Sequence, residues 1–240
     1  MGSVAENLAV VRERVDAACR SAGRDPAEVR LLPVSKTHGR EVIAEAYEAG
    51  VRLFGENRVQ EAAEKAEFFA DRPDLAWAII GHLQTNKAKL VATFASEFHA
   101  LDSIKVAEAL DRRLHDSGRS LDVFIQVNSS GEPQKFGLPP EEVEIFARKL
   151  EQFGTLNVRG LMTLAVFSDD QEAVRACFQR MQALQAELRD LGLPGSVDEL
   201  SMGMSGDFEL AIEYGATTVR VGQAIFGARL PPNDYWPPTP

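Results

Sequence analysis

The chain is poor in cysteine, lacks long apolar runs and carries no excess of positive charge. Its 240 residues include two cysteines, Cys19 and Cys177. Both stand at helical spacing among apolar residues, so we expect neither a disulfide framework nor a thiolate metal site. The longest apolar stretches are strand-sized and the first residues do not resemble a secretion signal, so we expect neither a membrane-spanning helix nor export. The formal charge of −10 argues against a nucleic-acid partner. From the cysteine usage and the first residues, we expect the protein in the cytoplasm.

Two common kinds of site are also not indicated. Residues 81–87 place a glycine six positions before a lysine, as a phosphate-binding P-loop does, but Asn86 replaces the second glycine and Ala88 the hydroxyl residue, so ATP is not expected. The histidines have neither helical pair spacing nor neighbouring cysteines, and we expect no metal site. They are His38, His82, His99 and His115.

The chain does show a regular alternation of short apolar segments and amphipathic segments. An opening helix carries Leu8, Val11, Val15 and Ala18 on one face. Strands are then expected at 31–35, 51–54, 77–80, 98–101, 121–127, 158–162, 199–202 and 217–221. Helices are expected at 39–49, 57–69 and 84–93, from the end of the fourth strand to about residue 114, and at 141–152, 169–191 and 207–214.

Eight strands, each followed by a helix or helical turn, predict an α/β protein with a (β/α)8 TIM barrel and an additional N-terminal helix. An open doubly wound sheet is the alternative. It is less favoured because no glycine-rich dinucleotide fingerprint follows any strand. We expect a single domain over 1–230 and a proline-rich C-terminal tail over 231–240 that has no chemical role.

A lysine, Lys36, ends the first apolar strand. In TIM barrels the chemistry takes place at the carboxyl ends of the strands, which makes the residues just after each strand the candidates. An ammonium group at an apolar strand end is partly desolvated, which favours its neutral form and makes it a nucleophile for an aldehyde. The simpler interpretation is a lysine that only extends into solvent.

Two glycine-bearing turns follow the last two strands, at 201–206 and 220–223. Glycine lets the backbone approach a ligand closely, and phosphate often binds after strands seven and eight of such barrels. Ser201 could add a hydroxyl donor, while Gly222 and Gln223 could supply backbone amides. Ser205 has a simpler interpretation as the N-cap of the following helix.

Six segments of the chain together resemble one protein family. They are VSKT at 34–37, FGENRVQE at 54–61, IGHLQTNK at 80–87, GLM at 160–162, LSMGMS at 200–205 and RVGQAIFG at 220–227. In this order they are similar to the pyridoxal phosphate homeostasis protein family, the YggS or PROSC type. The resemblance extends from the first helix to Arg229. Two positions depart from the family pattern, Ala78 for a histidine and Val166 for a proline, and both concern the rim beside strands three and six.

The resemblance implies a barrel like the N-terminal domain of alanine racemase, with pyridoxal 5'-phosphate (PLP) as the cofactor. It implies that Lys36 forms a Schiff base with PLP and that Ser201, Gly222 and Gln223 hold the phosphate. Asn57 would lie near the cofactor ring, and Arg220 would face the pyridine nitrogen. A guanidinium there opposes protonation of that nitrogen and weakens the cofactor as an electron sink.

Two classes of function remain open. The first is a PLP carrier in intracellular vitamin B6 homeostasis and amino-acid metabolism, without robust catalysis, that is monomeric and has PLP-dependent apo-enzymes as possible partners. The second is a fold type III racemase or lyase, which would need an acid/base on the opposite face of the substrate. In racemases that group is a tyrosine, and Tyr47, Tyr214 and Tyr235 do not stand at strand ends. A third, weaker hypothesis is a cofactor-free aldolase that forms a Schiff base through Lys36.

Overall fold

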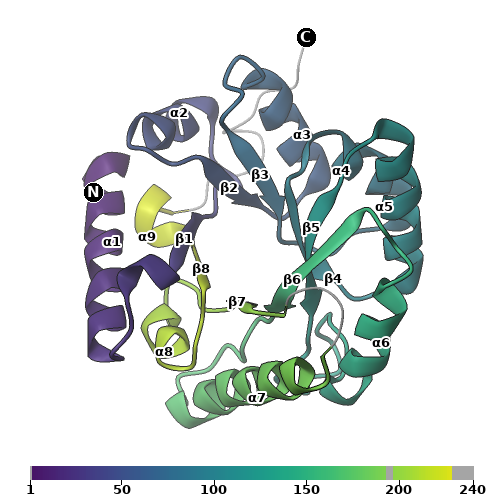
Figure 1. Cartoon of the computed structure of the whole chain (residues 1–240). Helices are drawn as coiled ribbons and strands as arrows, with labels where there is room; N and C mark the ends of the chain where they lie inside the picture. Colours follow the sequence, from purple (N-terminus) through teal and green to yellow (C-terminus); the bar gives the residue numbers. More distant parts are fainter. Residues whose placement is uncertain (1, 193–196, 229–240) are drawn as a thin grey trace.

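Eight parallel strands form a ring in the computed structural model, which describes residues 2–192 and 197–228 (Figure 1). The strands are paired in the order β1-β8-β7-β6-β5-β4-β3-β2, and an isolated parallel bridge between Val34 and Gly55 joins β1 to β2. The predicted TIM barrel is therefore confirmed. The strands are β1 (Arg30–Pro33), β2 (Leu53–Glu56), β3 (Ala76–Ile79), β4 (Glu97–Leu101), β5 (Leu121–Gln126), β6 (Leu156–Met162), β7 (Glu199–Ser201) and β8 (Thr218–Val221).

Helices surround this ring on the outside (Figure 1). They are α1 (Val4–Ser21), α2 (Arg40–Glu48), α3 (Val59–Phe68), α4 (Ala88–Phe94), α5 (Ile104–Ser117), α6 (Val143–Leu150), α7 (Gln171–Asp190), α8 (Phe208–Glu213) and α9 (Gln223–Phe226), with short 3-10 helices η1 (Pro26–Glu28), η2 (Thr85–Lys87) and η3 (Pro140–Glu142). Helix α1 begins at a capping box formed by Ser3 and Glu6. Its apolar face is buried, which confirms the predicted opening helix.

The predicted elements exist, but their limits differ where local geometry intervenes. The helix expected at 57–69 begins only at Val59, because Asn57 and Arg58 belong to the loop after β2. Helix α9 was not predicted, since it has only four residues. The N-cap interpretation of Ser205 is wrong, because the cap of α8 is Asp207. The predicted tail over 231–240 lies outside the described residues, as do residues 229 and 230 of the predicted domain.

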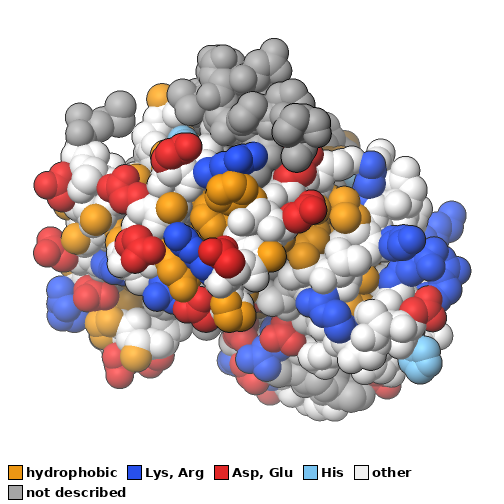
Figure 2. Space-filling view, turned by 90° about the horizontal axis from the view of Figure 1, so that it is seen from above, with side chains coloured by type: hydrophobic (Ala, Val, Ile, Leu, Met, Phe, Trp, Pro, Cys, Tyr) orange, Lys and Arg blue, Asp and Glu red, His pale blue; other side chains and the backbone are white. Residues whose placement is uncertain are grey.

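One continuous apolar core includes residues of the strands and of the helices around them. Gly160 in β6 shows how tightly two strands approach, because a Cβ atom there would lie 1.8 Å from the carbonyl oxygen of Glu199 in β7. On the face seen in Figure 2, hydrophobic side chains occur in small groups between acidic and basic ones. None of the helices within the described ranges is long and apolar enough to cross a membrane.

Candidate functional site

Backbone contacts join four neighbouring strand ends, those of β7, β8, β1 and β2, at one end of the barrel. The amide of Val34 donates to the Val221 carbonyl (2.9 Å), and the amide of Ser35 donates to the Gly55 carbonyl (3.1 Å). The amide of Arg220 donates to the Gly203 carbonyl in the loop after β7 (2.9 Å). These strand ends carry all six residues predicted to hold the cofactor, namely Lys36, Asn57, Ser201, Arg220, Gly222 and Gln223. The structure therefore brings them to one edge of the sheet.

Lys36 stands in a tight, strained turn. Its side chain is half-buried, and the amide of His38 donates to the Ser35 carbonyl across the turn (3.1 Å). Thr37 has φ +63°, the only positive φ of a non-glycine residue in the described ranges. A β-branched residue in this left-handed region costs about 1–3 kcal/mol and persists only where its surroundings impose it. The turn that presents Lys36 is therefore held in place by other contacts.

Those contacts come from three buried ionisable residues, Glu56, Glu61 and Lys65, which we call the charge cluster. Lys65 is fully buried in α3, and its Nζ donates to Glu56 Oε1 (2.7 Å) and to Glu61 Oε1 (2.8 Å). The same Nζ donates to the carbonyl of Ser35 (2.8 Å), whose hydroxyl donates to Glu56 Oε1 (2.6 Å). Burial raises the pKa of Glu56, which opposes the effect of the Lys65 ammonium. The cluster packs directly against the Lys36 turn.

Arg220 and Ser201 belong to a second buried network inside the ring. Arg220 Nη1 donates to Ser201 Oγ (2.8 Å) and Nη2 donates to the carbonyl of Thr163 (2.7 Å). Burial lowers the pKa of Arg220 to about 10, so its guanidinium stays charged at neutral pH. On the other side of Ser201 Oγ lies His99 Nδ1 (2.9 Å), and His99 Nε2 lies 2.7 Å from Glu97 Oε2.

The proton positions in this network follow from the pKa shifts. Burial lowers the pKa of His99, so its ring is neutral at pH 7. Burial alone would raise the pKa of Glu97, but hydrogen bonds from His99 and Arg30 lower it to about 2. Ionised Glu97 accepts a hydrogen bond from the Nε2–H group of His99, which leaves His99 Nδ1 to accept a hydrogen bond from the Ser201 hydroxyl. The Ser201 hydroxyl could therefore donate to a ligand only if its hydrogen bond to His99 Nδ1 were broken. The role of Ser201 in holding the phosphate stays a prediction.

The low pKa of Glu97 predicts a pH-dependent contribution to stability. A carboxyl whose pKa falls from 4.5 to about 2 on folding stabilises the native state above pH 4.5 and loses this effect as the pH falls towards 2. We expect Glu97→Gln to lower the free energy of unfolding by about 3 kcal/mol at pH 7 and by less than about 1 kcal/mol at pH 2.5. Urea unfolding at both pH values measures this, with exposed Glu64→Gln as the control. Equal losses at both values would contradict it.

Backbone amides near these strand ends can receive an anion. Within the described part of the chain, no acceptor meets the N–H groups of Ser205, Gly206, Gly222 and Gln223. Gly222 also packs closely on β1, because a Cβ atom at this position would lie 3.1 Å from the Val34 carbonyl oxygen. Unpaired amides in two joined loops fit a phosphate group, which accepts several N–H donors at once. The residues present therefore fit the phosphate of the predicted cofactor.

Sequence reasoning missed His99, Glu61 and Lys65 as parts of this region. The sequence suggests only the metal-ligand role of a histidine for His99, yet His99 stands two residues after Glu97 in β4, and alternate strand residues face the same side. Glu61 and Lys65 are four residues apart in α3, a spacing that is equally typical of an exposed ion pair. The available signal was that this helix face also carries buried Val59 and Ala62.

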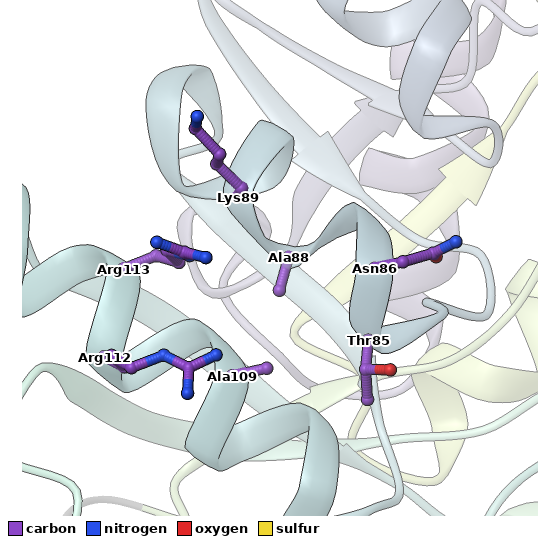
Figure 3. Close-up of a pocket in the computed structure, with 7 residues that line it drawn as sticks. All are labelled: Thr85, Asn86, Ala88, Lys89, Ala109, Arg112 and Arg113. Atoms are coloured by element: carbon purple, nitrogen blue, oxygen red, sulfur yellow. The ribbon is translucent and has the colours of Figure 1, made fainter.

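A separate hollow of about 270 Å³ lies in the outer layer, between η2, α4 and α5 (Figure 3). Three cationic side chains line it, together with small and polar residues, and none of the six predicted cofactor residues does. The lining residues are Thr85, Asn86, Ala88, Lys89, Ala109, Arg112 and Arg113. It is therefore distinct from the strand-end site.

Known proteins share both the sequence and the fold of this chain. The family model described as alanine racemase, N-terminal domain, matches residues 4–230. The chain is 43% identical over 238 residues to the pyridoxal phosphate homeostasis protein of Pseudomonas aeruginosa, covering 99% of both. It is 41% identical to the protein of that name in Escherichia coli K12, covering 95% of this chain and 98% of that one.

Solved structures give the same relationship. PipY of Synechococcus elongatus, whose structure has PLP bound, superimposes with a TM-score of 0.83 at 38% identity, covering 94% of this chain and all of PipY. Alanine racemase of Clostridium difficile superimposes with a TM-score of 0.70 at 16% identity, covering 94% of this chain and 58% of that one, which shows a shared fold. Identity over almost the full length places the chain in the pyridoxal phosphate homeostasis protein family.

Proposed function

We propose that this protein binds PLP covalently through Lys36 and acts as a carrier in cytoplasmic vitamin B6 homeostasis. The observation that carries the proposal is the meeting of a half-buried lysine with the free amides of two glycine-bearing loops at adjacent strand ends. PipY, at 38% identity, has PLP bound. Two buried cysteines without a disulfide suit a reducing compartment.

Five of the six predicted residues have a defined task in this proposal, and the sixth, Ser201, would contact the phosphate through its hydroxyl only if its hydrogen bond with His99 were broken. The amides of Gly222 and Gln223 hold the phosphate, and Asn57 lies beside the ring. Lys36 Nζ forms a C=N bond to the aldehyde carbon, and the aldehyde oxygen leaves as water. When bound, PLP supplies an aldehyde that captures amines and a ring that accepts electrons. A charged Arg220 near the ring nitrogen would keep that nitrogen unprotonated and weaken the electron sink.

The positions of the tyrosines favour a carrier over a racemase. Tyr47 lies in α2 and donates its hydroxyl to Asp74 (2.7 Å), and Tyr214 follows α8 and accepts from Arg175 (3.0 Å). Neither stands at a strand end, so neither offers the second acid/base that racemisation requires. Tyr235 lies outside the described residues. We therefore propose that the barrel acts as a monomer that passes PLP to apo-enzymes without robust catalysis of its own.

Trapping the cofactor tests the proposal. Purified protein incubated with PLP is expected to gain a visible absorbance band, and borohydride followed by peptide mapping is expected to place the cofactor on Lys36. Pyridoxal, which lacks the phosphate, is expected to bind at least about tenfold more weakly, since it makes no contact with the loop amides. A colourless protein that stays unlabelled would refute the proposal. Racemisation of alanine, followed by chiral analysis, would favour the enzyme instead.

A further inference from the structure

The charge cluster contacts the chain on both sides of Lys36. Lys65 Nζ donates to the carbonyl of Ser35 (2.8 Å), and Glu61 Oε1 accepts from the amide of Thr37 (2.8 Å). These two groups belong to the two peptide planes that flank residue 36. Because two flanking peptide planes set the direction of the Cα–Cβ bond between them, the cluster fixes the direction in which the Lys36 side chain leaves the chain.

The left-handed conformation of Thr37 requires such a constraint. A β-branched residue at φ +63° returns to extended or helical backbone unless its neighbours hold it. The hydrogen bond from the Thr37 amide to Glu61 holds it from α3, and the turn from Ser35 to His38 holds it along the chain. Without the Glu61 bond, Thr37 could relax and would turn the adjacent Lys36 away.

Stability alone does not account for the cluster. Its three side chains are at most 8% exposed, and Glu56 Oε2 is buried with no hydrogen-bond partner among the described residues. Buried ion pairs are often replaced by packed apolar residues without loss of stability, because removing charges from water is costly. A cluster that instead reaches two specific peptide groups has a geometric role that apolar side chains could not fill.

We propose that Glu61 and Lys65 are positioning residues that aim Lys36 at the incoming cofactor aldehyde. This inference rests on the proposed function, in which Lys36 forms the covalent bond. It concerns the rate at which that bond forms, because the phosphate is held by the separate loops after β7 and β8. Misplacing an attacking atom by about 1 Å lowers a rate by about 10- to 100-fold.

Two substitutions of Glu61 distinguish the effect of its side-chain length from the effect of its charge. Glu61→Asp keeps the charge beside Lys65 but withdraws the carboxylate from Thr37, so we expect covalent labelling of Lys36 to slow at least about tenfold while total PLP binding changes less than about threefold. Glu61→Gln keeps the reach of Oε1 and loses the charge, so we expect labelling near the wild-type rate. Stopped-flow absorbance gives the rate, and equilibrium dialysis gives the total binding.

Rescue distinguishes positioning from general damage. Glycine adopts a positive φ without a Cβ penalty. The double variant Glu61→Asp with Thr37→Gly is therefore expected to label Lys36 at least about threefold faster than Glu61→Asp alone. Glu64→Asp, an exposed change in the same helix, is the matched control and is expected to label like the wild type. Thermal unfolding of each variant shows that it is folded. Should Glu61→Asp fail to fold, Glu61→Gln remains decisive, since slow labelling of that variant would overturn the proposal.

The outcomes separate this inference from the proposed function. Wild-type labelling at a residue other than Lys36 would end both. Labelling at Lys36 with an unchanged rate in Glu61→Asp would overturn the inference alone. Slower labelling of Lys36 in Glu61→Gln than in Glu61→Asp would show that the charge of Glu61 matters and its side-chain length does not. That result would also overturn the inference.

Discussion

Lys36→Ala is expected to lose the visible absorbance band and the borohydride labelling, because Lys36 supplies the amine of the proposed C=N bond. Retention of PLP through dialysis should fall at least about 100-fold. In the variant only reversible hydrogen bonds from the loop amides hold PLP, whereas in the wild type the bound phosphate also keeps the aldehyde beside Lys36, which favours the covalent bond. The fold should survive, because Lys36 is half-buried and stands outside the apolar core. Absorbance, dialysis and thermal unfolding measure these three effects.

Two further variants make this result specific. Lys36→Arg keeps the positive charge but has no amine that condenses with the aldehyde, so it should lose the band as Lys36→Ala does. Lys149→Ala removes an exposed lysine near the end of α6 and should behave like the wild type. A band of normal intensity in Lys36→Ala would assign the bond to another lysine.

The largest expected loss of stability follows from Gly160→Ala. The added Cβ atom would lie 1.8 Å from the Glu199 carbonyl oxygen and 2.6 Å from its carbon, and both are backbone atoms that cannot rotate away. Strands β6 and β7 must therefore separate at the position where Gly160 pairs with Glu199. We expect the free energy of unfolding to fall by at least about 3 kcal/mol, measured by urea or thermal unfolding.

A second glycine just before the same strand provides the control. Gly154 lies in the turn before β6, and a Cβ atom there meets nothing within 4 Å. Gly154→Ala should change the free energy of unfolding by less than about 0.5 kcal/mol. If both alanine variants unfolded alike, the close approach of β6 and β7 would not be what limits position 160.

The fold could be predicted because each strand and helix carries its own signal. The strand prediction at 98–101 and the structure of β4 agree within one residue, since apolar Phe98 and Leu101 are bounded there by Ser96 before and by Asp102 and Ser103 after. Helix α9 could not be predicted because four residues after Gly222 give no periodicity. It packs against α1, where Asn7 Nδ2 donates to the Ile225 carbonyl (2.9 Å), and this is a tertiary contact.

The meeting of the predicted cofactor residues at one edge of the barrel could be predicted, but the hydrogen bonds around them could not. Lys36 and Gly222 follow strands, and the barrel rule alone places such residues together. The partners of Ser201 could not be predicted because His99 is 102 residues away and reaches it only through closure of the ring. The role of Lys65 could not be predicted for a different reason. A lysine in an amphipathic helix is normally solvated, and only the fold shows that Lys65 is buried against Ser35.

The join between β1 and β2 is one of the two shortest joins of the ring. Most neighbouring strands share a ladder of several paired residues, whereas β1 and β2 meet at the single bridge between Val34 and Gly55, and β7 and β8 pair only at Ser201 and Thr218. Local opening events break the weakest cooperative units first, and one of these two short joins ends two residues before Lys36. A join so short can open and close while the longer ladders stay intact, so the chain around position 36 could move without global unfolding.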